Sequence, residues 1–232
     1  MSADHPLVRM LAAFDVRVRE LGLALADASL WRPVSGPVGA GSSTPANTRA
    51  RALRAQAASR IWFAEAVPLA AFIEPDNRIA LVEPSLLRRL LAARVLFRCR
   101  DAVRRSVDRR TRQVLTECVG RDALTAISDL PITGSGADEA LPADLSPEAL
   151  ARDGWRIVTA DGGCSNATLR NIIELGLATG SYGLLRADLK PGRNTYAGTA
   201  GYGDGARAAG GDADSFFSEV GHMFPELQWL FG

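Results

Sequence analysis

Lysine and histidine are nearly missing from this chain of 232 residues. Of its 27 lysine and arginine residues only Lys190 is a lysine, so arginine carries almost all of the positive charge. The two histidines, His5 and His222, lie near opposite ends of the sequence. This scarcity leaves no histidine-based metal pattern and no base beside a candidate nucleophile. The sequence therefore predicts no metal site, no cofactor and no catalytic residues.

Cysteine is scarce as well. The three residues, Cys99, Cys118 and Cys164, have no metal-binding spacing, and their odd number suggests no disulfide framework. This usage indicates a reducing, cytoplasmic compartment. No apolar run approaches the ~20 residues that a membrane span needs, and the N-terminus shows no secretory signal. We therefore expect a cytoplasmic protein. Such a protein can still dock beneath a membrane complex.

Six apolar residues near the N-terminus repeat at helical spacing. They lie on one stripe of a helix: Leu7, Leu11, Phe14, Val18, Leu21 and Leu25. The pattern predicts an amphipathic helix over residues 5–27. Its stripe fits either the core of the domain or a coiled-coil seam. Docking on the core is favoured, because about three heptads make only a short coiled coil.

Proline and glycine divide the rest of the chain. Stretches near 31–44 and 129–147 predict linkers within a helical domain over residues 1–179. Residues 180–214 are rich in glycine, which predicts a loop-rich insert. With 47% apolar and 23% charged residues, the composition suits a globular protein with a sizeable core. We therefore expect a mostly α fold, a single irregular helical domain with a Gly-rich, loop-rich C-terminal region.

Local signals predict where shorter elements begin and end. A helix is expected from Pro45 to about residue 66, and the segment 75–83 is expected to be a turn with a short extended piece. Other expected features are Ser85 and Asp101 as N-caps of two arginine-rich helices, a stop at Gly120, a helix over 121–128, a helix opened by Ser146, a strand over 154–158, and Ser165 as the cap of a helix over 166–178.

Arginine is concentrated in one stretch. Between Leu86 and Arg112 the chain carries ten arginines against two acids, Asp101 and Asp108. Apolar residues run through this stretch at helical spacing, and one face of its second helix is expected to hold Val103, Val107, Thr111, Val114 and Cys118. The pattern predicts consecutive helices that bury one side and expose a cationic surface on the other.

A cationic surface indicates an anionic partner. Guanidinium groups bind carboxylates and phosphates equally well, so three interpretations stay open: a protein-interaction surface, a solvated helix face, and a site for nucleic acid or anionic lipid. The first is favoured because the net charge is only +1 and Phe97 is the only aromatic residue in the stretch. The expected contact residues are Arg88, Arg89, Arg104, Arg105 and Arg109.

The segment 215–232 is dense in large apolar side chains. Such a segment has to be buried, either on its own domain or on a partner protein. In the second case we expect the partner contacts to come from Phe224, Trp229 and Phe231, because aromatic side chains dominate protein interfaces.

Cys164 is a candidate nucleophile. It lies in a turn before an expected helix, where a helix N-terminus can lower the pKa of a thiol. A cysteine nucleophile also needs a base, and neither histidine is near it in sequence. An ordinary loop before a helix is the favoured interpretation, and a small cysteine-dependent enzyme is an alternative.

The order of motifs in the middle of the chain resembles a known family. Its segments are, in order, Arg78-Ile-Ala-Leu-Val-Glu-Pro84, Leu86-Leu-Arg-Arg-Leu-Leu91, Ala102-Val-Arg-Arg-Ser-Val107 and Gly120-Arg-Asp-Ala-Leu124. This order resembles the SctK/YscK family of type III secretion proteins. The early segment Asp27-Ala-Ser-Leu-Trp31 departs from the family's usual motif. The Gly-rich insert and the ending after Phe224 suit the Hrp-type branch.

The resemblance implies a non-enzymatic accessory subunit of the cytoplasmic sorting platform of type III secretion. Such proteins bridge the cytoplasmic domain of the inner-membrane ring protein SctD to the pod protein SctQ. We therefore expect SctD-like and SctQ-like protein partners, no small-molecule substrate, and a cytoplasmic place at the inner-membrane face of the secretion apparatus, peripheral and not inserted. The alternative is a nucleic-acid-binding regulator that uses the arginine-rich helices.

Overall fold

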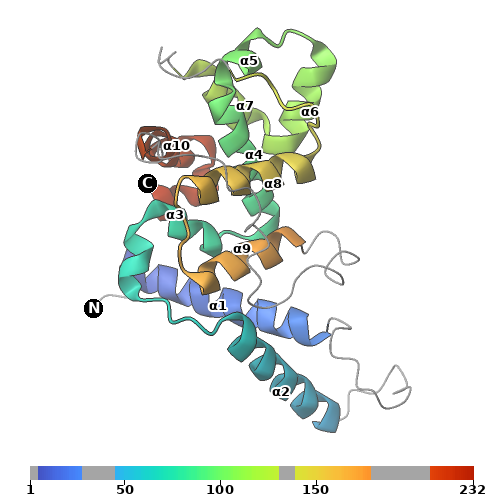
Figure 1. Ribbon diagram of the computed structural model, residues 1–232, viewed down its shortest axis with the longest axis vertical. Coiled ribbons are helices and arrows are strands. Elements are labelled where there is room, and N and C mark those ends of the chain that lie inside the picture. The colour runs from blue at the N-terminus through green and yellow to red at the C-terminus, as the bar shows by residue number, and fades with distance from the viewer. Residues whose placement is uncertain (1–4, 28–44, 131–138, 179–209) are drawn as a thin grey trace.

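The computed structural model describes residues 5–27, 45–130, 139–178 and 210–232, and every regular element in these ranges is helical (Figure 1). The predicted mostly α fold is confirmed. The longer helices are α1 (Pro6–Asp27), α2 (Pro45–Trp62), α4 (Pro84–Arg98), α5 (Arg100–Arg105), α6 (Arg109–Val119), α7 (Arg121–Asp129), α8 (Pro147–Ala160), α9 (Ala167–Ala178) and α10 (Gly210–Met223). Short turns complete the chain: η2 (Leu69–Ile73), α3 (Pro75–Arg78), η3 (Ile79–Leu81), η5 (Pro225–Leu227) and α11 (Gln228–Phe231).

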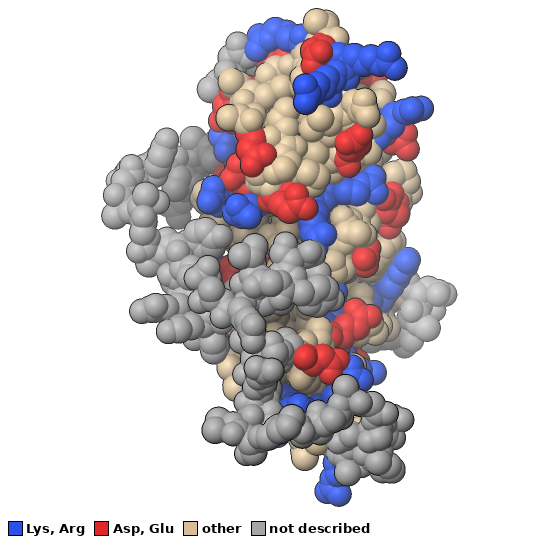
Figure 2. All heavy atoms as spheres, turned by 90° about the vertical axis from the view of Figure 1, so that its right-hand side faces the viewer, with Lys and Arg blue, Asp and Glu red and all other residues tan. Residues whose placement is uncertain are grey.

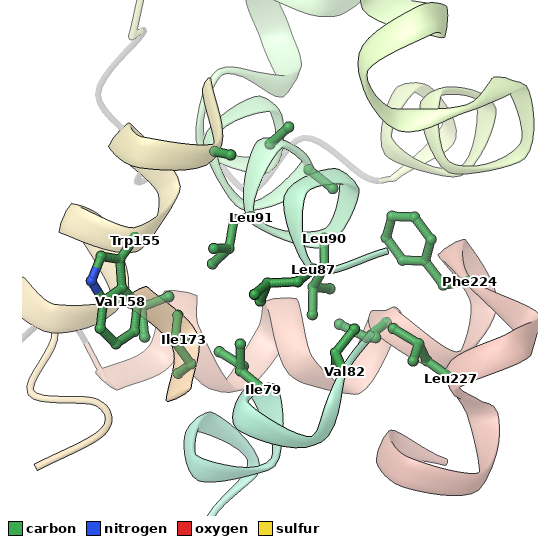
Figure 3. Close-up of a cluster of buried hydrophobic side chains, with 14 of the residues drawn as sticks. Ile79, Val82, Leu87, Leu90, Leu91, Trp155, Val158, Ile173, Phe224 and Leu227 are labelled. Atoms are coloured by element: carbon green, nitrogen blue, oxygen red, sulfur yellow. The ribbon is translucent and has the colours of Figure 1, made fainter. Parts of the chain in front are cut away.

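α4 forms the centre of the fold. Nine of its 15 residues are buried. In Figure 3 its side chains Leu87, Leu90 and Leu91 lie among buried side chains of α8, α9 and the C-terminal segment. Because helices from both halves of the chain cover α4, the described residues share one hydrophobic core.

α8 lies so close to α4 that one position has no room for a side chain. A Cβ at Gly154 would lie 2.0 Å from the backbone oxygen of Leu91. The neighbouring Trp155 and Val158 are buried. The prediction of a strand over 154–158 is wrong, because these residues form the inside of α8. Packing against α4 decides their conformation more strongly than their β propensity does.

α1 and α2 pair as an antiparallel hairpin at the lower end of the molecule in Figure 1. A Cβ at Gly22 would lie 2.6 Å from the Ser59 hydroxyl oxygen, and Asp27 pairs with Arg51 across the hairpin. The predicted helix over 5–27 is confirmed, and its apolar stripe docks on the core. Leu11 is the exception, because 41% of it remains exposed.

Several predicted boundaries are wrong because helices begin earlier or end sooner than the local signals indicated. Residues 75–81 form the helical turns α3 and η3 in place of an extended piece. α2 ends at Trp62. The N-cap of α4 is Glu83, and the hydroxyl of Ser85 donates to the Glu83 carboxylate at 2.5 Å.

The second arginine-rich helix is in fact two helices, α5 and α6. The carboxylate of Asp108 accepts hydrogen bonds from the backbone N–H and the hydroxyl of Thr111, both at 2.8 Å, and so caps α6. Asp101 lies inside α5 and caps neither helix. The predicted apolar face is therefore interrupted at Val107, which is fully outside both helices.

Other local predictions are confirmed. Gly120 ends α6 with φ of 91°, a conformation that favours glycine. α7 follows directly, and the Ser146 hydroxyl caps α8 at the backbone N–H of Ala149. α9 is present, but its first turn donates to the side chains of Asn166 and Glu65, in place of Ser165.

The C-terminal segment packs on the rest of the described chain. α10 begins at Gly210, so the last residues of the predicted insert 180–214 are helical. Residues 180–209 and the predicted linker 31–44 lie outside the described residues. Of the predicted linker 129–147, residues 139–146 form no helix or strand, whereas residues 131–138 are not described.

Candidate protein-interaction surface

The ten arginines between Leu86 and Arg112 do not form one cationic surface. Arg94 is the clearest departure, because only 1% of it is exposed. Its guanidinium pairs with the Asp161 carboxylate at 2.9 Å and lies over the Phe216 ring at 5.4 Å. Arg94 thus joins α4 to the end of α8 and to α10. A buried guanidinium needs such partners, since an unpaired charge in the core is costly.

Arg89 holds three parts of the chain together. It donates two hydrogen bonds, of 3.3 and 3.2 Å, to the backbone oxygen of Val119 at the end of α6. It also pairs with Glu226 at 3.5 Å and lies 5.5 Å from the Phe224 ring centroid. A Cβ at Gly120 would lie 2.5 Å from the Arg89 Nη2. The partner-binding role of Arg89 stays a prediction, but its guanidinium serves contacts inside the molecule.

Arg104 is engaged in a similar way. Its guanidinium donates to the backbone oxygens of Ser128 and Leu130, at the end of α7. These are carbonyls that a helix end leaves without partners. Arg98 pairs with Glu139, and Arg100 lies over the Phe97 ring at 5.3 Å. Most arginines on the α4 and α5 side of the stretch therefore make contacts within the chain.

The exposed arginines gather where α5 ends and α6 begins. We call residues 105–112 the α5–α6 tip; its exposed basic side chains are Arg105, Arg109, Arg110 and Arg112. Figure 2 shows basic side chains at the upper end of the molecule, where Figure 1 places α5 and α6. Arg88, half-buried on α4, is about 15 Å along that helix from its C-terminal end and does not belong to the tip.

Little acid offsets the charge of the tip. Asp108 is its only acidic residue. Hydrogen bonds from Thr111 lower the pKa of the Asp108 carboxyl, so the carboxylate is engaged at the start of α6. Within the described residues no ion pair joins Arg109 or Arg112 to an acidic side chain. Arg109 and Arg112 therefore present their guanidinium groups to an anionic partner.

Val107 is the residue of the tip that sequence reasoning misplaced. The apolar spacing assigned it to a buried helix face, yet 88% of it is exposed. A signal for the break was present: aspartate is one of the residue types preferred at a helix N-cap, and Asp108 directly follows Val107. An N-cap residue has a non-helical backbone, so one continuous helix could not run from Val107 through Asp108.

The aromatic residues of the C-terminal segment pack on the domain. Phe224 is 0% exposed and belongs to the core, which leaves it no surface for a partner. Phe231 stacks on Phe217 with ring centroids 5.7 Å apart, and Arg9 of α1 lies 4.1 Å over the Trp229 ring. Trp229 and Phe231 are only half-buried, so their predicted partner contacts stay predictions.

The cysteines are buried and poorly suited to nucleophilic chemistry. The Cys164 thiol donates to the backbone oxygen of Asp76 at 3.0 Å, and burial raises the pKa of this thiol well above its usual value. Burial also raises the pKa of Cys99 to about 11. A nucleophilic cysteine needs the opposite shift. Across the described ranges, no three His, Cys, Asp or Glu side chains are grouped so that they could hold a metal ion.

No helix in the described part of the chain combines the length and the hydrophobicity that crossing a bilayer requires. No curated protein and no solved structure matches the chain. The sequence model of the HrpB4 family, described as a bacterial type III secretion protein, matches residues 3–226. This match spans nearly the whole chain and agrees with the type III secretion family expected from the motif order and with the Hrp-type branch expected from the Gly-rich insert and the C-terminal ending. The chain therefore belongs to the HrpB4 family of bacterial type III secretion proteins.

Proposed function

We propose that this protein is a non-enzymatic adaptor of the cytoplasmic sorting platform of type III secretion. It would bridge the cytoplasmic domain of an SctD-like inner-membrane ring protein and an SctQ-like pod protein. The observation that carries the proposal is the family match over residues 3–226. The proposed location is cytoplasmic, at the inner-membrane face of the secretion apparatus.

A bridging protein needs two surfaces that do not block each other. The α5–α6 tip lies at one end of the molecule, and the α1–α2 hairpin lies at the opposite end (Figure 1). α2 carries four arginines and no acidic residue, and its Leu53 is 59% exposed. Because α2 packs chiefly on α1, much of its outer face is uncovered by the described chain. We propose these two ends as the two partner surfaces.

The tip keeps part of the predicted contact set. Arg105 and Arg109 are exposed there, joined by Arg110 and Arg112. Arginine binds carboxylates through a planar pair of donors, so an acidic surface on either partner protein fits the tip. We place Arg89 and Arg104 outside the contact set, because their guanidinium groups bind backbone oxygens of the same chain.

Affinity purification of the tagged full chain tests the adaptor function. The source is a cell that assembles the secretion apparatus, and mass spectrometry identifies the proteins recovered at moderate salt. We expect the ring protein and the pod protein together. Recovery of nucleic acid with unrelated proteins, and of neither platform component, would overturn the proposal.

Two charge-reversal variants show which surface of the protein binds a platform component in this purification. The variant Arg109→Glu, Arg112→Glu changes the tip by four charge units. Its matched control is Arg152→Glu, Arg156→Glu, which makes the same change on the exposed face of α8. We expect the tip variant to lose one of the two platform proteins and the α8 variant to keep both.

A further inference from the structure

The break between α5 and α6 presents an exposed apolar side chain within a basic surface. Val107 is 88% exposed, more than any other large hydrophobic residue that the structure describes. Its two neighbours are held in place. The backbone N–H of Ser106 donates to Ala102 and Val103 at the end of α5, and Asp108 caps α6.

This anchoring makes Val107 a fixed projection. Ser106 and Asp108 both have extended backbone conformations, with ψ of 98° and 123°, so the chain turns outward between two hydrogen-bonded helix ends. A β-branched side chain also has few rotamers to lose. A partner that binds Val107 therefore orders little of the chain, and preorganisation of this kind favours affinity.

The surroundings of Val107 define the chemistry of the partner. Arg105 stands before it and Arg109, Arg110 and Arg112 follow it, all exposed. The carboxylate within the tip, that of Asp108, is engaged by Thr111. A complementary surface must therefore offer an apolar pocket at its centre and carboxylates at its rim.

We propose that the α5–α6 tip is a docking knob: Val107 enters an apolar pocket on a partner protein, and the arginines beside it meet carboxylates around that pocket. This inference rests on the proposed adaptor function, because it takes the partner to be one of the two platform proteins. A phosphate backbone would match the arginines but would leave Val107 without a counterpart, since phosphate contacts use charge alone.

The replacement Val107→Lys separates these partners. It adds a positive charge, so it strengthens binding to any polyanion and places an ammonium group in an apolar pocket if the partner is a protein. The variant is expected to fold normally, because the side chain lies outside both helices and makes little contact with the core. Its matched control is Ile73→Lys at the end of η2, outside both proposed partner surfaces, where 63% of the isoleucine is exposed.

The test measures affinities of the purified full chain for the ring protein's cytoplasmic domain and for the pod protein, each separately. We expect Val107→Lys to weaken binding to one of them by about tenfold or more, since that is the effect of losing a buried valine. Ile73→Lys is expected to leave that affinity unchanged. Circular dichroism and thermal melting verify that both variants are folded.

The outcomes are distinguishable. If the unaltered chain binds neither protein, both the adaptor function and the knob are overturned. If it binds but Val107→Lys binds equally well or more tightly, only the knob is overturned. Two further probes, duplex DNA and vesicles containing phosphatidylglycerol, cover the other anionic partners. Tight binding to either one, increased by Val107→Lys, would assign the tip to that ligand and contradict the proposal.

Discussion

The arginines on α4 and those at the α5–α6 tip belong to one arginine-rich stretch of the sequence, but they differ in their surroundings. On α4, Arg89 and Arg94 are turned inward to a carbonyl, a carboxylate and aromatic rings. At the tip, Arg109 and Arg112 are exposed. The difference comes from the neighbours: α4 is covered by helices on several sides, whereas the tip lies at one end of the molecule. Arginine density alone therefore does not identify a binding surface.

The largest loss of stability is expected when the buried arginine, Arg94, is replaced. Arg94→Ala leaves the Asp161 carboxylate, 15% exposed at its side chain, without its cation. We expect the free energy of unfolding to fall by about 3–5 kcal/mol, measured by denaturant unfolding. The paired replacement Arg94→Met, Asp161→Asn is expected to recover much of that loss. Equal stability of Arg94→Ala and the unaltered chain would show that the pair does not stabilise the fold.

A smaller effect is expected at Arg104, which is only half-buried. Arg104→Ala removes the donors to two backbone oxygens at the end of α7. We expect a loss of about 2 kcal/mol in the free energy of unfolding. The exposed Arg110 is the control, because Arg110→Ala is expected to change stability by no more than about 0.5 kcal/mol. If Arg110→Ala lowered the free energy of unfolding as much as Arg104→Ala does, the arginines of the tip would not differ from those that contact the core.

The acidic residues near Arg94 are expected to make the stability of the fold depend on pH. Burial, with the charges of Asp161, Glu74 and Asp214, raises the pKa of the Asp76 carboxyl, although Arg94 opposes the shift. A folded-state pKa above the unfolded value means that the folded state binds the proton more tightly, so this group's contribution to stability is lost as pH rises through that interval. Asp76→Asn is expected to be relatively more stable than the unaltered chain at neutral pH, with a smaller difference near pH 3. Denaturant unfolding at several pH values measures this, and a pH-independent difference would contradict it.

The smallest effect on stability is expected at the tip. Arg109→Glu, Arg112→Glu changes two exposed side chains of α6, and we expect the free energy of unfolding to stay within about 0.5 kcal/mol of the original. The same variant is expected to lose roughly tenfold in affinity for one platform protein. A clear loss of stability in this variant would show that Arg109 and Arg112 stabilise the fold, as Arg94 is expected to do.

The sequence predicted those structural features that depend on residues close together in the chain. The stripe from Leu7 to Leu25, the stop at Gly120 and the cap at Ser146 each depend on neighbours within a turn or two. The family followed from the order of motifs, which needs no coordinates.

The rest depended on which helices meet. Arg89 and Arg104 bind carbonyls 30 and 24 residues further along the chain, and no periodicity indicates such pairs. Trp155 lies in a helix because α4 packs against Gly154 beside it. Val107 was misplaced because one long helix was assumed where the Asp108 cap makes two.

The C-terminal segment has a consequence for biosynthesis. Phe216 packs under Arg94 and against Phe97 of α4, and Phe224 lies beneath Arg89. A nascent chain cannot cover this side of α4 until the ribosome has released residues 216–230. Until then α4 keeps an apolar flank open, and chaperones or proteases act on such surfaces. Premature termination between Val119 and Phe216 would thus yield a chain marked for degradation, even though α5 and α6 had already been made.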